Sequence, residues 1–182
     1  MVHFLRRDLR IEMVKSIVKL FQIQLEYIFE NNKKQDHACW DSLYADDAEH
    51  IIGTVFVILQ NYINSSISDL YPELSELYIK YKLDEKIGNS NSTKIELIIS
   101  VANYYKHRDL PTNLRKDTSK HFENLGIEYK HFYDLEKTKY SHKIGADSPV
   151  FGGFSYLSDS WDLNDLLKIA SEWRENLWLV GK

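Results

Sequence analysis

Cysteine, proline and glycine are all scarce in this chain of 182 residues. Cys39 is the single cysteine, so the chain cannot form an internal disulfide, and a reducing, cytoplasmic environment is expected. Three prolines and seven glycines supply few of the turns that many short strands would need. The sequence therefore favours long helices over a sheet-rich fold.

Long hydrophobic runs are missing as well. No stretch of about 18 apolar residues occurs, so we expect no membrane span and no membrane partner. The first residues enter a charged amphipathic pattern directly, without the apolar segment of a secretory signal. Both features predict a cytoplasmic location.

A strong positive charge is also lacking, because the formal net charge is −4. The protein as a whole is therefore not an electrostatic nucleic-acid binder. Residues 94–143 differ from the rest, since they carry 10 basic and 7 acidic side chains, a net charge of +3, and four of the seven histidines. This band could contact phosphates, although a solvated helical surface would have the same composition.

Apolar residues recur at steps of three and four along most of the chain, which is the spacing of one helical face. The expected helices are residues 4 to 31 or 32, residues 41 or 42 to a pause at 64–66, a run after Pro72, a helix from the cap Thr93 to His107, residues 112–125, and residues 162–178. Thr93 and Glu96 have the spacing of a capping box, and Gly126 is a predicted C-terminal cap.

These stripes predict a single all-α domain, residues 1–182, folded as an antiparallel bundle of about five to six helices. Residues 1–125 would form the bundle core, and residues 161–182 the C-terminal helix. Between them, residues 126–160 are predicted to be an irregular, aromatic-rich insertion with room for short strands. Within it, Phe151-Gly152-Gly153-Phe154 is interpreted as a turn with aromatic anchors.

A polar strip runs along the helix that is expected to end near His107. Asn103 and His107 are one turn apart and share a face, and Lys106 and Arg108 flank them. A histidine can move a proton near neutral pH, and a cation can stabilise the charge that develops during phosphodiester cleavage. The alternative is structural, because a histidine and cations at a helix C-terminus also complement the helix dipole.

The segment Ala102-Asn103-Tyr104-Tyr105-Lys106-His107 resembles the motif of HEPN domains, which are helical bundles. In that motif an arginine, a polar residue, three variable residues and a histidine follow one another; Asn103 and His107 match, and Ala102 replaces the arginine. The resemblance implies metal-independent RNA cleavage at a site formed across a homodimer, with His107 as acid–base. It also implies a bacterial toxin–antitoxin or phage-defence role, with an antitoxin-like protein partner.

Two further groups of residues are candidate sites. Arg115 and His121 fit a looser spacing that the same family tolerates, although on a regular helix they would lie about 120° apart, and His121 could instead pack in the core. His37, Cys39 and Asp41 are metal ligands by type, but their spacing matches no standard structural zinc site. We therefore expect no metal and no other cofactor.

The leading hypothesis is a HEPN-like protein that engages RNA as a metal-independent endoribonuclease and forms a homodimer. The expected catalytic residues are His107, Asn103 and Arg108. Lys106, Arg115 and His121 are expected to bind the substrate, with Lys106, Arg108 or Arg115 replacing the charge of the missing arginine. The alternative is a catalytically inactive helical interaction or regulatory module. A third hypothesis, an enzyme acting on a small molecule in the aromatic region, has less support.

Overall fold

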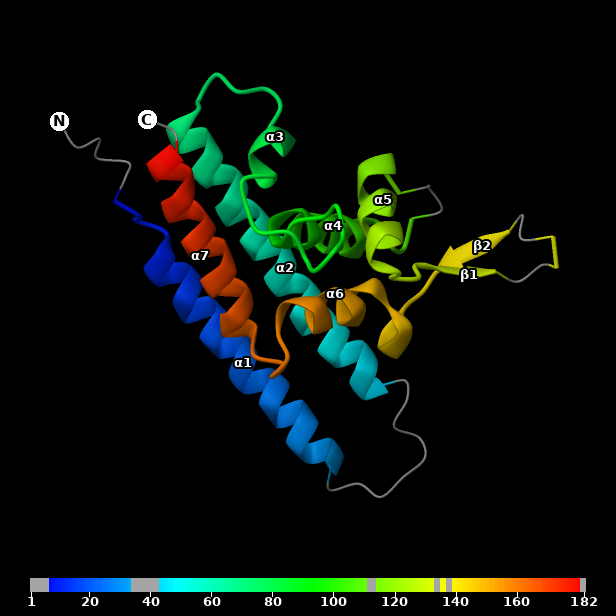
Figure 1. Cartoon of the computed structure of the whole chain (residues 1–182). Helices are drawn as coiled ribbons and strands as arrows, with labels where there is room; N and C mark the ends of the chain where they lie inside the picture. The colour runs from blue at the N-terminus through cyan, green and yellow to red at the C-terminus, as the bar shows by residue number, and fades with distance from the viewer. Residues whose placement is uncertain (1–6, 34–42, 111–113, 133–134, 137–138, 181–182) are drawn as a thin grey trace.

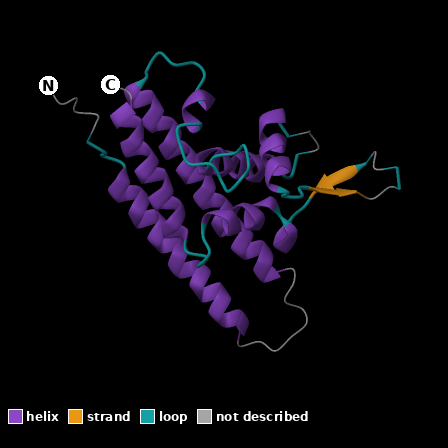
Figure 2. Cartoon of the chain, in the orientation of Figure 1, coloured by secondary structure: helices purple, strands orange, loops and turns teal. Residues whose placement is uncertain are grey.

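The computed structural model describes residues 7–33, 43–110, 114–132, 135–136 and 139–180 (Figure 1). Within these residues the chain forms seven α-helices, a short 3-10 turn and one two-stranded sheet (Figure 2). The predicted all-α bundle is confirmed.

Three long helices form one side of the bundle: α1 (Ile11–Lys33), α2 (Leu43–Leu70) and α7 (Leu163–Val180). α1 and α7 pack along each other in opposite directions, and both pack on α2 (Figure 1). On the other side of α2 lie α4 (Lys94–His107) and α6 (Pro149–Leu157), with α5 (Lys116–Leu125) packed on α4. The single turn α3 (Tyr78–Tyr81) precedes α4.

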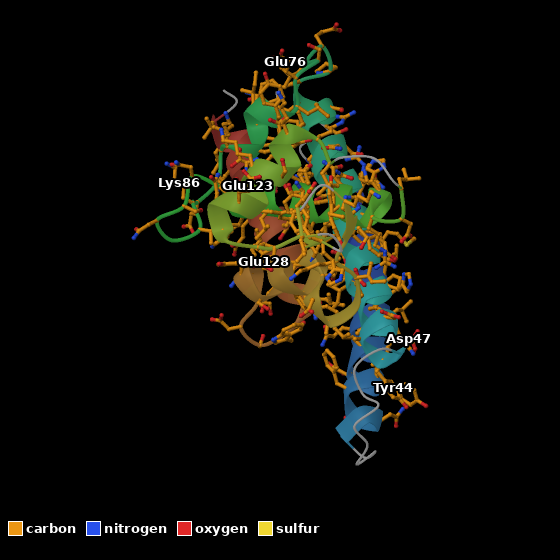
Figure 3. The ribbon with its side chains drawn as sticks, turned by 90° about the vertical axis from the view of Figure 1, so that its right-hand side faces the viewer. Tyr44, Asp47, Glu76, Lys86, Glu123 and Glu128 are labelled. Carbon is orange, nitrogen blue, oxygen red and sulfur yellow. The ribbon has the colours of Figure 1, made fainter. Side chains whose placement is uncertain are left out.

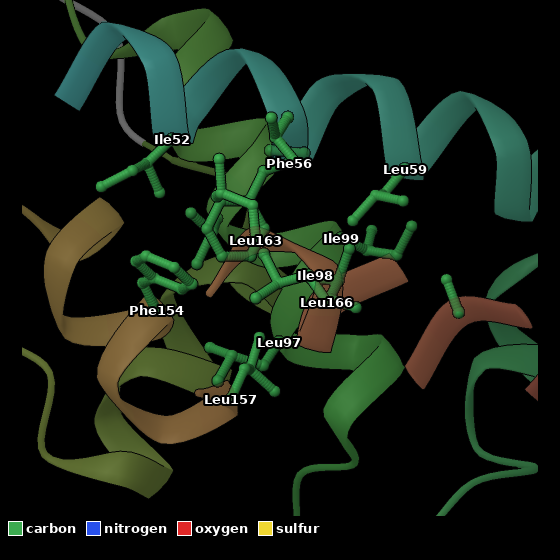
Figure 4. Packing of buried hydrophobic residues seen from close by; sticks show 14 of the residues in the cluster. Ile52, Phe56, Leu59, Leu97, Ile98, Ile99, Phe154, Leu157, Leu163 and Leu166 are labelled. Atoms are coloured by element: carbon green, nitrogen blue, oxygen red, sulfur yellow. The ribbon is translucent and has the colours of Figure 1, made fainter. Parts of the chain in front are cut away.

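α2 is the central helix because its apolar residues cover most of its circumference. Figure 4 shows side chains of four helices meeting in the core: Ile52, Phe56 and Leu59 of α2, Leu97, Ile98 and Ile99 of α4, Phe154 and Leu157 of α6, and Leu163 and Leu166 of α7. Among the described helices, α2 is the one long and apolar enough to cross a membrane, but 56% of its apolar window is buried inside the protein. This burial is that of a helix in a protein core.

Local capping signals set several helix ends. At the start of α4, the Thr93 hydroxyl accepts from the Glu96 N–H at 3.1 Å, and the Glu96 carboxylate accepts from the Thr93 N–H at 2.9 Å. The predicted capping box is confirmed, as is the left-handed cap Gly126 after α5, with φ 67°.

Other expected ends are wrong. The first helix begins at Ile11, because the Asp8 carboxylate accepts from the N–H groups of Arg10 and Ile11, at 3.1 Å each. α2 continues through the expected pause at residues 64–66, since buried Ser66 donates its hydroxyl to the Tyr62 carbonyl at 2.8 Å. The run after Pro72 is helical only as α3, and α5 begins at Lys116, after residues 111–113, which lie outside the described part.

Residues 126–160 contain more regular structure than predicted. β1 (Lys130–Phe132) and β2 (Tyr140–His142) form an antiparallel pair with His131 opposite Ser141, so short strands do occur. The predicted turn at residues 151–154 is wrong, because it lies inside α6. Ser148 caps this helix by accepting from the Val150 N–H at 3.3 Å, and Pro149 occupies its first turn, where proline is favoured.

Candidate functional site

A cleft of about 760 Å³ is lined by four parts of the chain. These are α2, α4, α5 and the connection between α2 and α4, which includes α3. We call this cleft the α4 cleft. Its walls hold four of the six predicted site residues: Asn103 and Lys106 of α4, Arg115 at the N-cap of α5, and His121 of α5. Figure 3 shows the molecule from the side of α5, with the wall residue Glu76 labelled near one end. Residues far apart in the sequence are therefore brought together.

α4 supplies the floor of this cleft because its two faces differ. Leu97, Ile98 and Val101 are buried in the core. Glu96, Ser100 and Asn103 follow one another at steps of three and four, and all three line the cleft. The polar strip expected from the sequence therefore lies where a ligand can reach it, up to Lys106.

A chain of hydrogen bonds orders one end of the α4 cleft. Lys106 donates its ammonium to Gln60 Oε1 at 2.6 Å, and Gln60 donates through Nε2 to Asn103 Oδ1 at 2.9 Å. Burial lowers the pKa of Lys106, and the positive charge of Arg115 lowers it further. Among the described residues, Arg115 forms no ion pair. Lys106 and Arg115 therefore repel each other, and an anion bound between them would relieve this repulsion.

His121 lies at another part of the cleft, with its side chain 16% exposed. Its Nδ1 is 2.8 Å from Ser92 Oγ, and its Nε2 is 3.9 Å from Glu96 Oε1. When Nδ1–H donates to the Ser92 hydroxyl oxygen, Nε2 keeps its lone pair, and the nearby Glu96 carboxylate stabilises a proton that Nε2 gains. Burial lowers the pKa of His121 despite the opposing charge of Glu96. His121 is therefore neutral near pH 7 and can accept a proton.

Ser92, His121 and Glu96 are the residue types of a hydrolytic triad, but Ser92 cannot be its nucleophile. Ser92 is fully buried and does not line the α4 cleft. Its Oγ also accepts from Asn124 Nδ2 at 3.2 Å. Ser92 therefore orients the imidazole of His121 from behind, and the reactive side of the ring is the Nε2 side.

His107 lies outside the cleft walls, exposed at the end of α4. Its side chain has no hydrogen bond or ion pair with the part of the chain that the structure describes. Asn103 and His107 share a helical face, but only Asn103 lines the cleft. The preceding motif position, Ala102, is fully buried, so the position of the motif arginine faces the core in this chain.

Arg108 also lies away from the cleft, in a buried ion pair. Its Nη1 is 2.5 Å from Oε1 of Glu49, and the Gly145 N–H donates to the other carboxylate oxygen at 2.7 Å. Burial opposes the charge of the guanidinium, but the Glu49 carboxylate outweighs it and raises the pKa of Arg108. The charge of Arg108 is thus already neutralised, and the pair ties the end of α4 to α2.

Several cleft residues were not predicted from the sequence. Gln60 holds both Lys106 and Asn103, and the Tyr81 hydroxyl donates to Asn64 Oδ1 at 2.7 Å. Burial raises the pKa of Tyr81 to about 12. Lys82 and Lys120 add positive charge to the walls. No local pattern marks these residues, because each belongs to an ordinary helix or turn and only the fold brings them together.

The metal-ligand types His37, Cys39 and Asp41 lie outside the described residues. Within the described ones, no group of three or more His, Cys, Asp or Glu side chains is arranged to hold a metal ion.

Comparison of the chain with protein-family models, with curated proteins and with solved structures finds no match. The resemblance to HEPN domains therefore stays a prediction that rests on Asn103 and His107.

Proposed function

We propose that the protein binds RNA in the α4 cleft and cleaves it as a metal-independent endoribonuclease. The observation that carries the proposal is the meeting of Asn103, Lys106, Arg115 and His121 in one cleft. These side chains supply an amide, two cations and a neutral imidazole, which are the groups that phosphodiester cleavage requires.

The shape and charge of the cleft suit a short single-stranded segment. Glu96 and Lys106 lie about 15 Å apart along the axis of α4, because an α-helix rises about 1.5 Å per residue. That length fits two or three nucleotides. Four cations line the walls against three carboxylates (Lys82, Lys106, Arg115 and Lys120 against Glu76, Glu96 and Asp117). Tyr78 and Tyr81 are also wall residues and offer rings on which bases can stack.

In the proposed reaction, neutral His121 takes the proton of the ribose 2′-hydroxyl, whose oxygen attacks the adjacent phosphorus. The bond from phosphorus to the 5′-oxygen breaks, and the imidazolium returns its proton to that oxygen. The products are a 2′,3′-cyclic phosphate and a 5′-hydroxyl. Lys120 and Lys82, whose positive charges act on His121, stabilise the negative charge on the phosphorane oxygens, while Lys106 and Arg115 hold a neighbouring phosphate of the strand.

The test uses fluorescently labelled single-stranded RNA with EDTA present. Binding is measured by anisotropy at several salt concentrations, and products are identified by their end groups. We expect Lys106→Ala with Arg115→Ala to weaken binding by about 10- to 100-fold and to reduce its salt dependence. His121→Gln is expected to abolish cleavage while binding persists.

His107→Ala is the matched control, because His107 lies on the same helix but outside the cleft. It should leave binding and cleavage unchanged. If cleavage is lost in His107→Ala and kept in His121→Gln, the site is the helix end that the HEPN resemblance implies, and the role of the α4 cleft is refuted. If the folded protein binds no RNA, the inactive interaction module replaces the nuclease. The toxin–antitoxin or phage-defence role and the antitoxin-like partner are proposals that rest on the resemblance alone.

A further inference from the structure

α1 has two apolar faces, and only one of them is used by the bundle. Val14, Val18, Leu25 and Ile28 are buried against α2 and α7. A second set points outward, with more than half of each residue exposed: Met13 66%, Leu20 68%, Ile23 54% and Tyr27 60%. Such a contiguous exposed apolar stripe is unusual on a monomer.

The exposed set follows the spacing of a coiled-coil seam. Positions 13, 16, 20, 23 and 27 of α1 are separated by alternating steps of three and four, which is the pattern of a and d positions in heptads. Ser16, also exposed, is the one polar residue among them. This average step of 3.5 keeps the outer stripe facing one partner helix along about four turns, whereas an ordinary surface helix has no reason to repeat it. We call these five positions the α1 seam.

We propose that the α1 seam pairs with the α1 seam of a second copy of this chain, antiparallel, to form a homodimer. Charge complementarity indicates that the partner is a second copy of this chain and that the two helices run antiparallel. Lys19 and Glu26 are exposed and flank the seam on the same side, at equivalent heptad positions. When Leu20 of one copy packs beside Ile23 of the other, Lys19 of each copy lies opposite Glu26 of the other.

Other arrangements lack this match. A parallel pair would place Lys19 opposite Gln24 and Glu26 opposite Asn31, without an ion pair. An antiparallel pair shifted so that Met13 packs beside Ile23 would set Lys19 against Lys19 and Glu12 against Glu26. A membrane surface is not favoured either, because the flanks carry both signs of charge and not the basic excess that binds anionic lipid.

The seam is independent of the RNA proposal. α1 lies on the far side of α2 from α5 and the α4 cleft (Figure 1). None of the seam residues lines that cleft. A variant of the seam can therefore lose dimerisation while it still binds RNA, and a variant of the cleft can lose RNA binding while it still dimerises. Failure of one proposal is thus distinguishable from failure of the other.

The first test is sedimentation of the full chain across a range of concentrations. The wild-type protein is expected to be a dimer in equilibrium with monomer. Leu20→Glu should raise the dissociation constant by about 100-fold or more, because a leucine is lost from each half of the interface. Leu20 makes no core contact, so circular dichroism and thermal unfolding of the variant should match those of the monomeric wild type.

Ile144→Glu is the matched control, since Ile144 is 58% exposed and lies off the seam. It should leave the dimer intact. A wild-type protein that stays monomeric, or a dimer that persists in Leu20→Glu, would overturn the proposal.

A charge exchange tests the register. Glu26→Lys should weaken the dimer by about tenfold, because two attractive pairs become repulsive, and Lys19→Glu combined with Glu26→Lys should restore it. In the shifted register Glu26→Lys would instead strengthen the dimer through Glu12, and that result would refute the proposed pairing. The intrahelical hydrogen bond from Gln22 Nε2 to Glu26 Oε1, at 2.9 Å, is lost in both variants and so cancels in their comparison.

Discussion

Glu49 and Arg108 face each other inside the bundle, with side-chain exposures of 0% and 8%. Removing one member of such a pair leaves a desolvated charge without a partner. Glu49→Ala is therefore expected to lower the free energy of unfolding by about 3–5 kcal/mol, measured by urea denaturation. Glu49→Leu combined with Arg108→Leu should cost less than the single change, because neither charge is then buried alone. A loss below about 1 kcal/mol in Glu49→Ala would contradict the burial of the pair.

His121 predicts a dependence of stability on pH. Its folded-state pKa is lowered from 6.5 by burial, while Glu96 and Asp117 oppose that effect and Lys120 and Lys82 add to it. As the pH falls below about 6.5, the unfolded chain binds this proton before the folded protein does, so stability decreases. The wild-type free energy of unfolding should therefore fall more steeply between pH 7.5 and 5.5 than that of His121→Gln. Equal slopes would show that His121 titrates as in the unfolded chain.

At the scale of elements, α2 and α4 are in close contact where Gly53 meets the ring of Tyr105. A Cβ at position 53 would overlap three atoms of that ring. The ring is held in place, because the Tyr105 hydroxyl lies 2.8 Å from His50 Nδ1. Gly53→Ala should thus lower the free energy of unfolding by about 1–3 kcal/mol, although alanine favours helices more than glycine does. Tyr105→Ala in the same chain should remove most of this penalty, as a double-mutant cycle would show.

The elements that the sequence predicted well are those with local causes. The Thr93 capping box and the Gly126 cap each depend on residues within one turn, so their patterns suffice. α6 was missed because its two glycines resemble a turn, and only the fold shows why they are tolerated: a Cβ on Gly153 would overlap Val101. The continuation of α2 past residue 66 likewise depends on burial, which a pattern of polar residues hides.

At the scale of the whole molecule, the candidate site was predictable only in part. The strip on α4 followed from helical spacing, and Arg115 and His121 from the looser spacing that the HEPN resemblance allows. The separation of Arg108 from the cleft could not be foreseen, because its partner Glu49 lies in another helix. The same holds for Gln60 and Tyr81, which reach the cleft through tertiary packing alone. Residue chemistry thus pointed to a part of the chain that lines the α4 cleft, while tertiary packing decided which of its residues line that cleft.

The walls of the α4 cleft come from α2, α4 and α5, and α2 and α4 also form the centre of the hydrophobic core. Any molecule that occupies the cleft therefore bridges elements that must separate when the chain unfolds. Its binding free energy is added to that of folding, by about 4 kcal/mol at a concentration 1,000 times the dissociation constant. A rise in the melting temperature of this protein when a compound is added consequently indicates that the compound binds, and this measurement does not require knowledge of the reaction.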